Sequence, residues 1–413
     1  MPVHSGGMAV NMSNMQSIFV IESLRAGIPT RISTRELPDL RKNLTDGIVE
    51  DLASFERNVI PRGRLMWGQY GQGKTHALTS IEHVALDKNF AVSRVSLSRE
   101  VSCHNLHSFY GFAVPRIKTP ESTLEGIQHY LNRQQASDLP NSRILENGRY
   151  ENSLPAIVFE DYYYSEGEEK DKLYGDLTGI RLPAGELGRI HRNCRQEALP
   201  KLNFKMSEHL RAYFGVMADA LVFCGFEGWV ILIDEVELIG RLGKTSRYKA
   251  YSNLSWLLNW NGGMKYPIYT VAAAATRLQD DLWYGKKDDD RSAMPAMAAE
   301  KYGEEASKEM ESFFEKAIDG FSLKILPAKE EDIIKLLVKI SELHGDAYQW
   351  SPELDPASLI SHLGSQPVRT YIRAALEFLD LQYLYNQKQI PDAAELGEMT
   401  FDDKNIDNDE EAI

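Results

Sequence analysis

Residues 68–75 read Gly-Gln-Tyr-Gly-Gln-Gly-Lys-Thr and fit the pattern G-x-x-x-x-G-K-[ST] of a phosphate-binding loop. A short apolar run at 65–67 precedes the loop, as a strand would, and an amphipathic stretch at 76–86 follows it, as a helix would. A loop set between a strand and a helix in this way is typical of one fold class. The motif therefore predicts an α/β protein of the P-loop NTPase class, with a parallel sheet and flanking helices.

The fixed positions of this loop have separate chemical roles. The glycines allow a tight backbone whose N–H groups point at phosphate oxygens, and the helix that follows adds the positive end of its dipole. Lys74 supplies a mobile positive charge for the β- and γ-phosphates, and the hydroxyl of Thr75 is a ligand for Mg²⁺. The predicted cofactors are therefore ATP and Mg²⁺. The predicted nucleotide-binding residues of the loop are Gly68, Gln69, Tyr70, Gly71, Gln72, Gly73, Lys74, Thr75 and His76.

A second motif supports the first. Residues 229–233 form an apolar, largely β-branched run that ends in Asp234 and Glu235. Such a run predicts a strand buried on both faces of a parallel sheet, and carboxylates at its carboxyl end emerge where ligands bind in open α/β sheets. Asp234 is predicted to hold Mg²⁺, and Glu235 is predicted to activate water as a general base. The acid pair favours ATP hydrolysis over kinase or small-GTPase chemistry.

Further candidate residues lie outside these two motifs. A strand predicted at 267–275 ends at Thr276, which is the position called sensor 1 in the AAA+ group of ATPases. Arg369 falls in the first turn of a predicted helix, where AAA+ lids present a sensor 2 arginine; an ordinary surface arginine is the alternative. Ile28 and Pro29 are predicted to cover the adenine, with plain packing as the alternative.

The chain is predicted to have four parts. They are a flexible N-terminus (1–14), a P-loop ATPase core (15–326) with a helical or loop insertion around 101–225, a helical lid domain (327–390) and an acidic, disordered tail (391–413). The lid is predicted to contain helices over 330–344, 355–363 and 368–385. Within the insertion we expect helices over 128–146 and 205–223, and a solvated acidic loop over 160–169.

Composition narrows the class of protein. The net charge of −14 argues against a protein that binds nucleic acid with its whole surface. No apolar run approaches the roughly 20 residues needed to span a bilayer, and no secretory signal is recognisable at the start. The cysteines, Cys103, Cys194 and Cys224, are scattered and odd in number, which is typical of reduced thiols. A cytoplasmic protein without membrane partners is expected.

The loop and four other stretches resemble one family. Residues 68–76, with histidine after the threonine, resemble the G-[EQ]-Y-G-x-G-K-T-H motif of the BREX (bacteriophage exclusion) system ATP-binding proteins, in particular BrxD-like ones. The other stretches look like its E-x-L-R-x-G segment, its second strand, its Asp-Glu strand and the helix after that strand; they are 22–29, 95–97, 232–237 and 248–258. Gln69 stands where many relatives carry glutamate, a change that leaves the phosphate cradle intact.

This resemblance implies an AAA+/ASCE-like ATPase that acts in phage defence. Its implied partners are ATP, other proteins of the defence system, double-stranded DNA reached through a complex, and further copies of the chain in a homo-oligomer. A ring of subunits also implies an arginine finger that acts on the neighbouring subunit. The candidates for the finger are Arg241, Arg247 and Arg277.

Several functions remain open from the sequence. The leading one is ATP hydrolysis coupled to assembly or remodelling of a DNA-acting complex; the alternative is a slow or non-hydrolysing switch or scaffold that recruits partners in one nucleotide state. A loader like the origin-recognition ATPases is disfavoured, because only about 28 residues follow Tyr385, too few for a winged helix. A small-molecule kinase is disfavoured because no acceptor site is visible.

Overall fold

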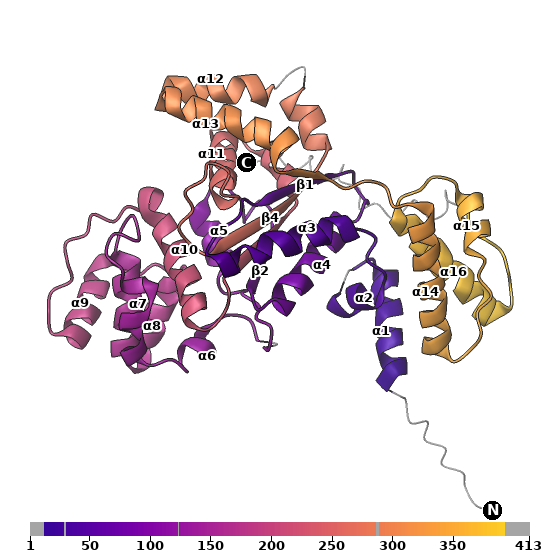
Figure 1. Ribbon diagram of the computed structural model, residues 1–413, viewed down its shortest axis with the longest axis horizontal. Helices are drawn as coiled ribbons and strands as arrows, with labels where there is room; N and C mark the ends of the chain where they lie inside the picture. The colour runs from indigo at the N-terminus through magenta and orange to yellow at the C-terminus, as the bar shows by residue number, and fades with distance from the viewer. Residues whose placement is uncertain (1–11, 29, 123, 286–288, 393–413) are drawn as a thin grey trace, which may run out of the picture. The chain divides into compact units, whose positions relative to one another are not determined.

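The computed structural model describes residues 12–28, 30–122, 124–285 and 289–392, so most of the predicted flexible N-terminus and acidic tail lies outside it. The described residues divide into two compact units, whose elements Figure 1 labels along the chain. The sheet unit comprises residues 43–69 and 81–325. The terminal unit comprises the described parts of 1–42, 70–80 and 326–413.

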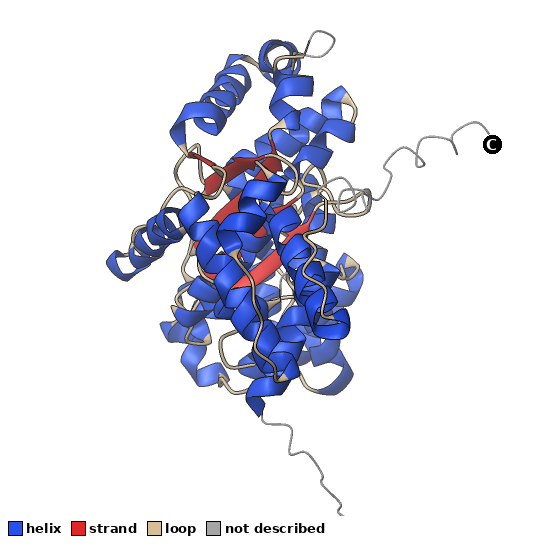
Figure 2. Cartoon of the chain, turned by 90° about the vertical axis from the view of Figure 1, so that its right-hand side faces the viewer, coloured by secondary structure: helices blue, strands red, loops and turns tan. Residues whose placement is uncertain are grey.

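Five parallel strands form the sheet, in the order β2-β3-β4-β1-β5. Their bounds are β1 Arg64–Gly68, β2 Ala91–Ser96, β3 Trp229–Asp234, β4 Ile268–Ala275 and β5 Ser322–Lys324. Every residue of β3 and β4 is buried, because helices cover both faces, and this explains why their sequences are continuous apolar runs (Figure 2). The predicted α/β fold, with a parallel sheet and flanking helices, is confirmed, and so is the predicted C-terminal helical group.

The register of the sheet brings four strand ends to one edge. Gly68, the last residue of β1, lies opposite Ala275, the last residue of β4. On the other side of β4, Asp234 ends β3 opposite Ser96 of β2. All these strands run in parallel, so the loop after β1 leaves the sheet at the same carboxyl edge where β3 ends in its carboxylates.

Helices account for more residues of the sheet unit than strands do. Their bounds are α3 Lys42–Ala53, α5 Leu106–Ala113, α6 Gln128–Leu131, α7 Leu154–Tyr164, α8 Gly167–Leu177, α9 Ala184–Arg195, α10 Met206–Phe223, α11 Lys244–Leu257, α12 Asp290–Tyr302 and α13 Glu304–Glu315. Helix α4 Lys74–Asp87 begins in the terminal unit and ends in the sheet unit. The helix predicted at 205–223 is confirmed as α10.

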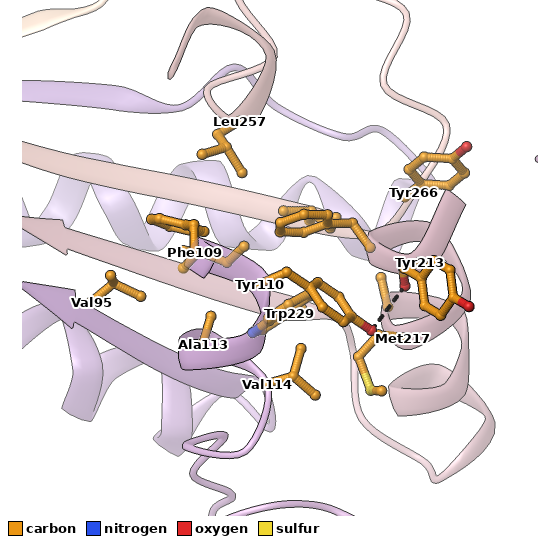
Figure 3. Packing of buried hydrophobic residues seen from close by; sticks show 14 of the residues in the cluster. Val95, Phe109, Tyr110, Ala113, Val114, Tyr213, Met217, Trp229, Leu257 and Tyr266 are labelled. Carbon is orange, nitrogen blue, oxygen red and sulfur yellow. Dashed lines mark hydrogen bonds between the residues drawn. The ribbon is translucent and has the colours of Figure 1, made fainter. Parts of the chain in front are cut away.

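An aromatic core joins the segment between β2 and β3 to the sheet (Figure 3). The ring centroid of Phe214 on α10 lies 5.8 Å from that of Trp229 on β3 and 4.8 Å from that of Tyr110 on α5. The indole of Trp229 donates to Ser93 Oγ at 2.9 Å, and the hydroxyl of Tyr110 donates to the carbonyl of Leu177 at 2.6 Å. Each aromatic ring buried in this way contributes ~2 kcal/mol, so these helices share one core with the sheet.

The acidic stretch 160–169 is not a solvated loop, and that prediction was wrong. Helix α7 runs to Tyr164 and α8 begins at Gly167. Tyr162 is fully buried, and Asp161 is buried beside His191, whose Nδ1 lies 2.7 Å from its carboxylate. Composition misled because acidic and tyrosine side chains that find buried partners belong to a core as readily as apolar ones.

The prediction of a single helix over 128–146 was also wrong. Only Gln128–Leu131 is α-helical, and two 3₁₀ turns, Ala136–Asn141 and Arg143–Leu145, follow it. Pro140 lies inside the first of these turns. A proline removes a backbone donor and clashes with the preceding turn of an α-helix, so the apolar spacing here could not extend into a single helix.

The terminal unit combines both ends of the chain. Its helices are α1 Met12–Ala26, α2 Arg31–Glu36, α14 Glu330–Tyr348, α15 Pro356–Leu363 and α16 Val368–Tyr385. The last three confirm the predicted C-terminal helices, with α14 four residues longer than expected. Val20, Ile21 and Leu37 are buried in one cluster with apolar residues of α14, α15 and α16, so the N-terminal helices are part of the same core.

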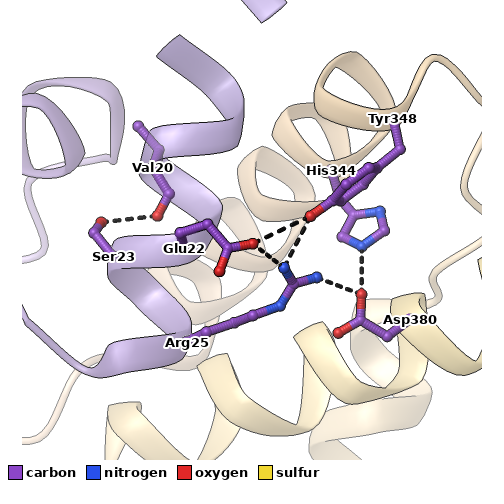
Figure 4. Close-up of polar contacts among 7 residues, drawn as sticks. All are labelled: Val20, Glu22, Ser23, Arg25, His344, Tyr348 and Asp380. Carbon is purple, nitrogen blue, oxygen red and sulfur yellow. Dashed lines mark hydrogen bonds and ion pairs between the residues drawn. The ribbon is translucent and has the colours of Figure 1, made fainter. Parts of the chain in front are cut away.

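A polar network holds α1 to α14 and α16 (Figure 4). Arg25 donates to the hydroxyl of Tyr348 at 2.8 Å and pairs with Asp380. His344 lies between Asp380, 3.0 Å from its Nε2, and Trp350, whose indole N–H lies 3.0 Å from His344 Nδ1. An indole N–H can only donate a hydrogen bond, so Nδ1 of His344 accepts from Trp350. Nε2 then carries the hydrogen and donates it in a hydrogen bond to the carboxylate of Asp380. Arg25 is a cation that balances the charge of Asp380.

The charge of Asp380 is stabilised by these contacts. Burial alone would raise the pKa of this carboxyl, but the hydrogen bonds from His344 and Arg25 outweigh burial and lower the pKa.

Among the described helices, none is long and apolar enough to cross a membrane.

Candidate functional site

The phosphate-binding loop connects β1, which ends at Gly68, to α4, which begins at Lys74. Gly71 has φ +77° and Gly73 has φ +82°, values that favour glycine. A Cβ built on Gly73 meets nothing closer than 3.8 Å, so backbone strain and not lack of space requires a glycine there. The amide of Ala77 donates to the carbonyl of Gly73 at 2.9 Å, which starts the helix directly after the loop.

The loop side chains differ in exposure. Lys74 is buried, at 8% exposure, and Thr75 is half-buried on the first turn of α4. Tyr70 is 76% exposed, and Gln69 is also exposed. Partial burial lowers the pKa of the His76 imidazole, and the nearby Arg41 adds to the shift while Asp39 opposes it. The loop thus combines a glycine-rich backbone with the buried side chain of Lys74 and the neutral imidazole of His76.

The two carboxylates at the end of β3 are held differently. Asp234 is buried, and its carboxylate lies 3.3 Å from Nη2 of Arg94 on the neighbouring β2. Glu235 has φ +59° and its amide donates to Asp234 Oδ1 at 3.0 Å. A left-handed glutamate costs about 1–2 kcal/mol, and such strain gathers at functional sites because neighbouring structure imposes it.

Thr276 lies at the same edge of the sheet. Its amide lies 3.3 Å from the carbonyl of Gly68, so the end of β4 is tied to the start of the loop. Glu237, in the 3₁₀ turn Val236–Arg241, accepts from the amide of Ala275 at 2.8 Å. The turn after the Asp-Glu pair therefore fixes the backbone just before Thr276.

Two of these residues, Arg94 and Glu237, were not among the predicted site residues. Arg94 could have been noticed as the one charge inside an otherwise uncharged strand, Ala91–Ser96. Glu237 carried no signal, because its partner is a backbone amide far away in sequence. Within the described residues, no group of three or more His, Cys, Asp or Glu side chains is arranged to hold a metal ion.

The terminal unit holds the remaining predicted residues. Arg369 lies on the first turn of α16 with its guanidinium against Gly27, where an added Cβ would come within 2.6 Å of Nη2. Ile28 is 61% exposed, and Pro29 lies outside the described residues. Pro367, just before α16, faces Gly71 of the loop, 3.7 Å from where a Cβ would be.

The three arginine-finger candidates differ in access. Arg247 is buried and pairs with Asp290 at 2.9 Å, so it serves the interior of the sheet unit. Arg277 is 85% exposed and pairs with Asp281, and Arg241 is exposed. Only the two exposed arginines are accessible to a second subunit.

The N-terminal part of the chain is similar to a known family. Residues 12–133 match a family model described as the BREX system ATP-binding protein BrxC/D. The resemblance expected from the sequence is thereby confirmed over this segment, which contains 22–29 and the whole phosphate-binding loop. No curated protein sequence matches the chain significantly.

The chain also has a low similarity to a solved structure. It is the Orc1 protein of Aeropyrum pernix in complex with DNA, 12% identical with a TM-score of 0.35. The alignment covers 86% of this chain and 64% of that one, so this chain spans less than two thirds of the Orc1 chain. A likeness of this degree carries no inference about function or partners.

Proposed function

With residues 12–133 matched to the BREX ATP-binding family, we propose that this chain binds ATP with Mg²⁺ and hydrolyses it, and that turnover drives assembly or remodelling of a DNA-acting complex in phage defence. One observation carries the proposal. The phosphate-binding loop leaves β1 at the same carboxyl edge of the sheet where β3 ends in Asp234 and Glu235.

Phosphate binding rests on the loop. The N–H groups around Gly71 and Gly73 and the amino end of α4 attract the phosphates, and Lys74 neutralises their charge. Thr75 and Asp234 suit Mg²⁺, because a hydroxyl and a carboxylate are the hard oxygen ligands that this ion prefers. When bound, Mg²⁺ offsets the negative charge of the β- and γ-phosphates.

Hydrolysis rests on Glu235. Its carboxylate takes a proton from a water molecule while the water oxygen attacks the γ-phosphorus. The bond from the γ-phosphorus to the bridging oxygen breaks, and ADP and inorganic phosphate are released. The Thr276 hydroxyl orients the water or a γ-phosphate oxygen, and Arg369 supplies positive charge from α16.

The test is ATP hydrolysis by the purified chain beside its Glu235→Gln variant, each with and without double-stranded DNA. We expect the variant to bind ATP and to lose turnover by about 100-fold or more, because the amide cannot take the proton. Glu311→Gln, on an exposed position of α13, is the matched control and keeps full activity. Equal turnover by wild type and Glu235→Gln would remove the catalytic assignment.

A nucleotide-dependent switch with slow turnover is the second candidate. The ion pair between Arg94 and Asp234 favours it, because a carboxylate engaged by arginine is less available to Mg²⁺. The same experiment separates the two, since a switch binds ATP with negligible turnover in wild type and recruits its partner equally well as Glu235→Gln.

The proposed partners are other proteins of the defence system, double-stranded DNA reached through a complex, and further copies of the chain. Light scattering during size-exclusion chromatography, with and without ATP, tests the homo-oligomer. We further propose that 327–390 act as the lid of the ATPase core and that the chain works in the cytoplasm.

A further inference from the structure

Arg41, in the N-terminal segment, donates a hydrogen bond to the backbone of the phosphate-binding loop. Its Nη2 donates to the carbonyl of Gln72 at 2.5 Å, and its Nη1 donates to the carbonyl of Leu326 at 2.7 Å. All three residues belong to the terminal unit. The guanidinium therefore connects the loop to the chain that leads into the C-terminal helices, and neither motif of the sequence includes it.

The geometry of one peptide unit gives this contact a consequence for phosphate binding. The carbonyl of Gln72 and the N–H of Gly73 belong to the same peptide, and in a trans peptide the two groups point in opposite directions. A donor that holds the carbonyl on one side fixes the direction of the N–H on the other. Gly73 is a fixed glycine of the loop, whose N–H groups cradle phosphates in P-loop proteins.

Charge adds to this orienting effect. Hydrogen bonds in series polarise one another, so a cationic donor on the carbonyl makes the N–H of the same peptide a stronger donor. Arg41 is half-buried, and burial lowers its pKa while the neighbouring Asp39 opposes the shift. An arginine keeps its charge under such conditions. The hydrogen bond from Arg41 to the carbonyl of Gln72 is therefore charge-assisted, and it lies in a partly desolvated environment.

We propose that Arg41 is a positioning residue of the nucleotide site: it aims and strengthens the Gly73 N–H toward a nucleotide phosphate, and it links the loop to Leu326. The inference rests on the proposed function, because it concerns how the same loop binds nucleotide. It assigns to the N-terminal segment a role in phosphate recognition in addition to its packing.

The first test is the affinity for ADP, measured by calorimetry on wild type, Arg41→Gln and Arg41→Lys. Loss of a charge-assisted hydrogen bond is expected to weaken ADP binding about tenfold or more in Arg41→Gln, with partial recovery in Arg41→Lys, which keeps the charge. Arg57→Gln, an exposed arginine outside the loop, is the matched control and leaves the affinity unchanged. Thermal melting without nucleotide verifies that each variant is folded.

The second test observes the peptide itself. Gln72-Gly73 is the only Gln-Gly step in the sequence, so labelling with ¹³C-carbonyl glutamine and ¹⁵N-glycine gives one HNCO peak for this peptide. Without nucleotide, Arg41→Gln is expected to shift the carbonyl carbon upfield. With saturating ADP, the amide proton is expected to move downfield in wild type and less far in the variant. A purely structural role would change melting but not this signal.

The outcomes are distinct. If wild type binds ADP and Arg41→Gln binds it equally with the same amide shift, the inference is overturned while the proposed function stands. If wild type binds no nucleotide, the proposed function fails, and the carbonyl shift without nucleotide still decides whether Arg41 holds the loop. Weaker ADP binding together with a reduced amide shift supports the inference.

Discussion

Single residues in this chain are constrained by groups far away in sequence, and Gly27 is an example. It has φ +67°, and an added Cβ would come within 2.6 Å of the Arg369 guanidinium. Replacing Gly27 with alanine therefore strains the backbone and displaces the candidate sensor arginine. We expect Gly27→Ala to lower the free energy of unfolding by about 1–2 kcal/mol, measured by urea denaturation.

The matched control for this change is Gly47→Ala. Gly47 lies in helix α3, has no atom within 4 Å of its added Cβ and keeps a helical backbone, so alanine should be neutral or stabilising by up to about 1 kcal/mol. Equal effects of the two substitutions would contradict the argument from Arg369 and the left-handed backbone.

At the scale of elements, we expect the stability of the junction of α1 with α14 and α16 to depend on pH. The folded pKa of Asp380 is lowered, so its contribution to stability is present above the unfolded pKa, about 3.9, and is lost as pH falls through the folded pKa. Asp380→Asn should cost about 2 kcal/mol near pH 7, because a charge-assisted hydrogen bond is lost. The difference from wild type should shrink below about pH 4.

Asp346→Asn, an exposed position on α14, provides the comparison for that experiment. Its unfolding free energy should follow wild type across the same pH range. A stability difference between wild type and Asp380→Asn that did not change down to pH 2 would show that the ion pair with Arg25 does not stabilise the junction.

Elements also show what sequence reasoning could and could not reach. The strands that end at Gly68, Asp234 and Ala275 were predicted, because uninterrupted apolar runs signal strands covered on both faces. The pairing of Arg25 with Asp380 and the contacts of Arg41 with Gln72 and Leu326 were not, because these partners lie 31 to 355 positions away and hydrogen-bond partners have no period. The stretch 160–169 misled because burial of its charges depends on α9, which local composition does not reveal.

For the whole molecule, the terminal unit is one core built from separate stretches of chain. Val20, Ile21 and Leu37 are buried among the C-terminal helices, and each contributes ~2 kcal/mol that the C-terminal stretch alone would lack. We expect a fragment of residues 326–392 to show no cooperative thermal transition by circular dichroism. Co-expression with residues 12–42 should restore the transition, and a cooperative melt of the fragment alone would refute the shared core.

The pairing of Arg25 with Asp380 spans 355 positions of the chain, and this has a consequence during protein synthesis. At about 5–20 residues per second, a ribosome needs roughly 20 to 70 seconds between these two residues. For most of that time α1 has been made but α14 and α16 have not, so Val20 and Ile21 remain exposed to water and to chaperones. Helix α1 is thus synthesised long before the helices that bury its apolar side chains.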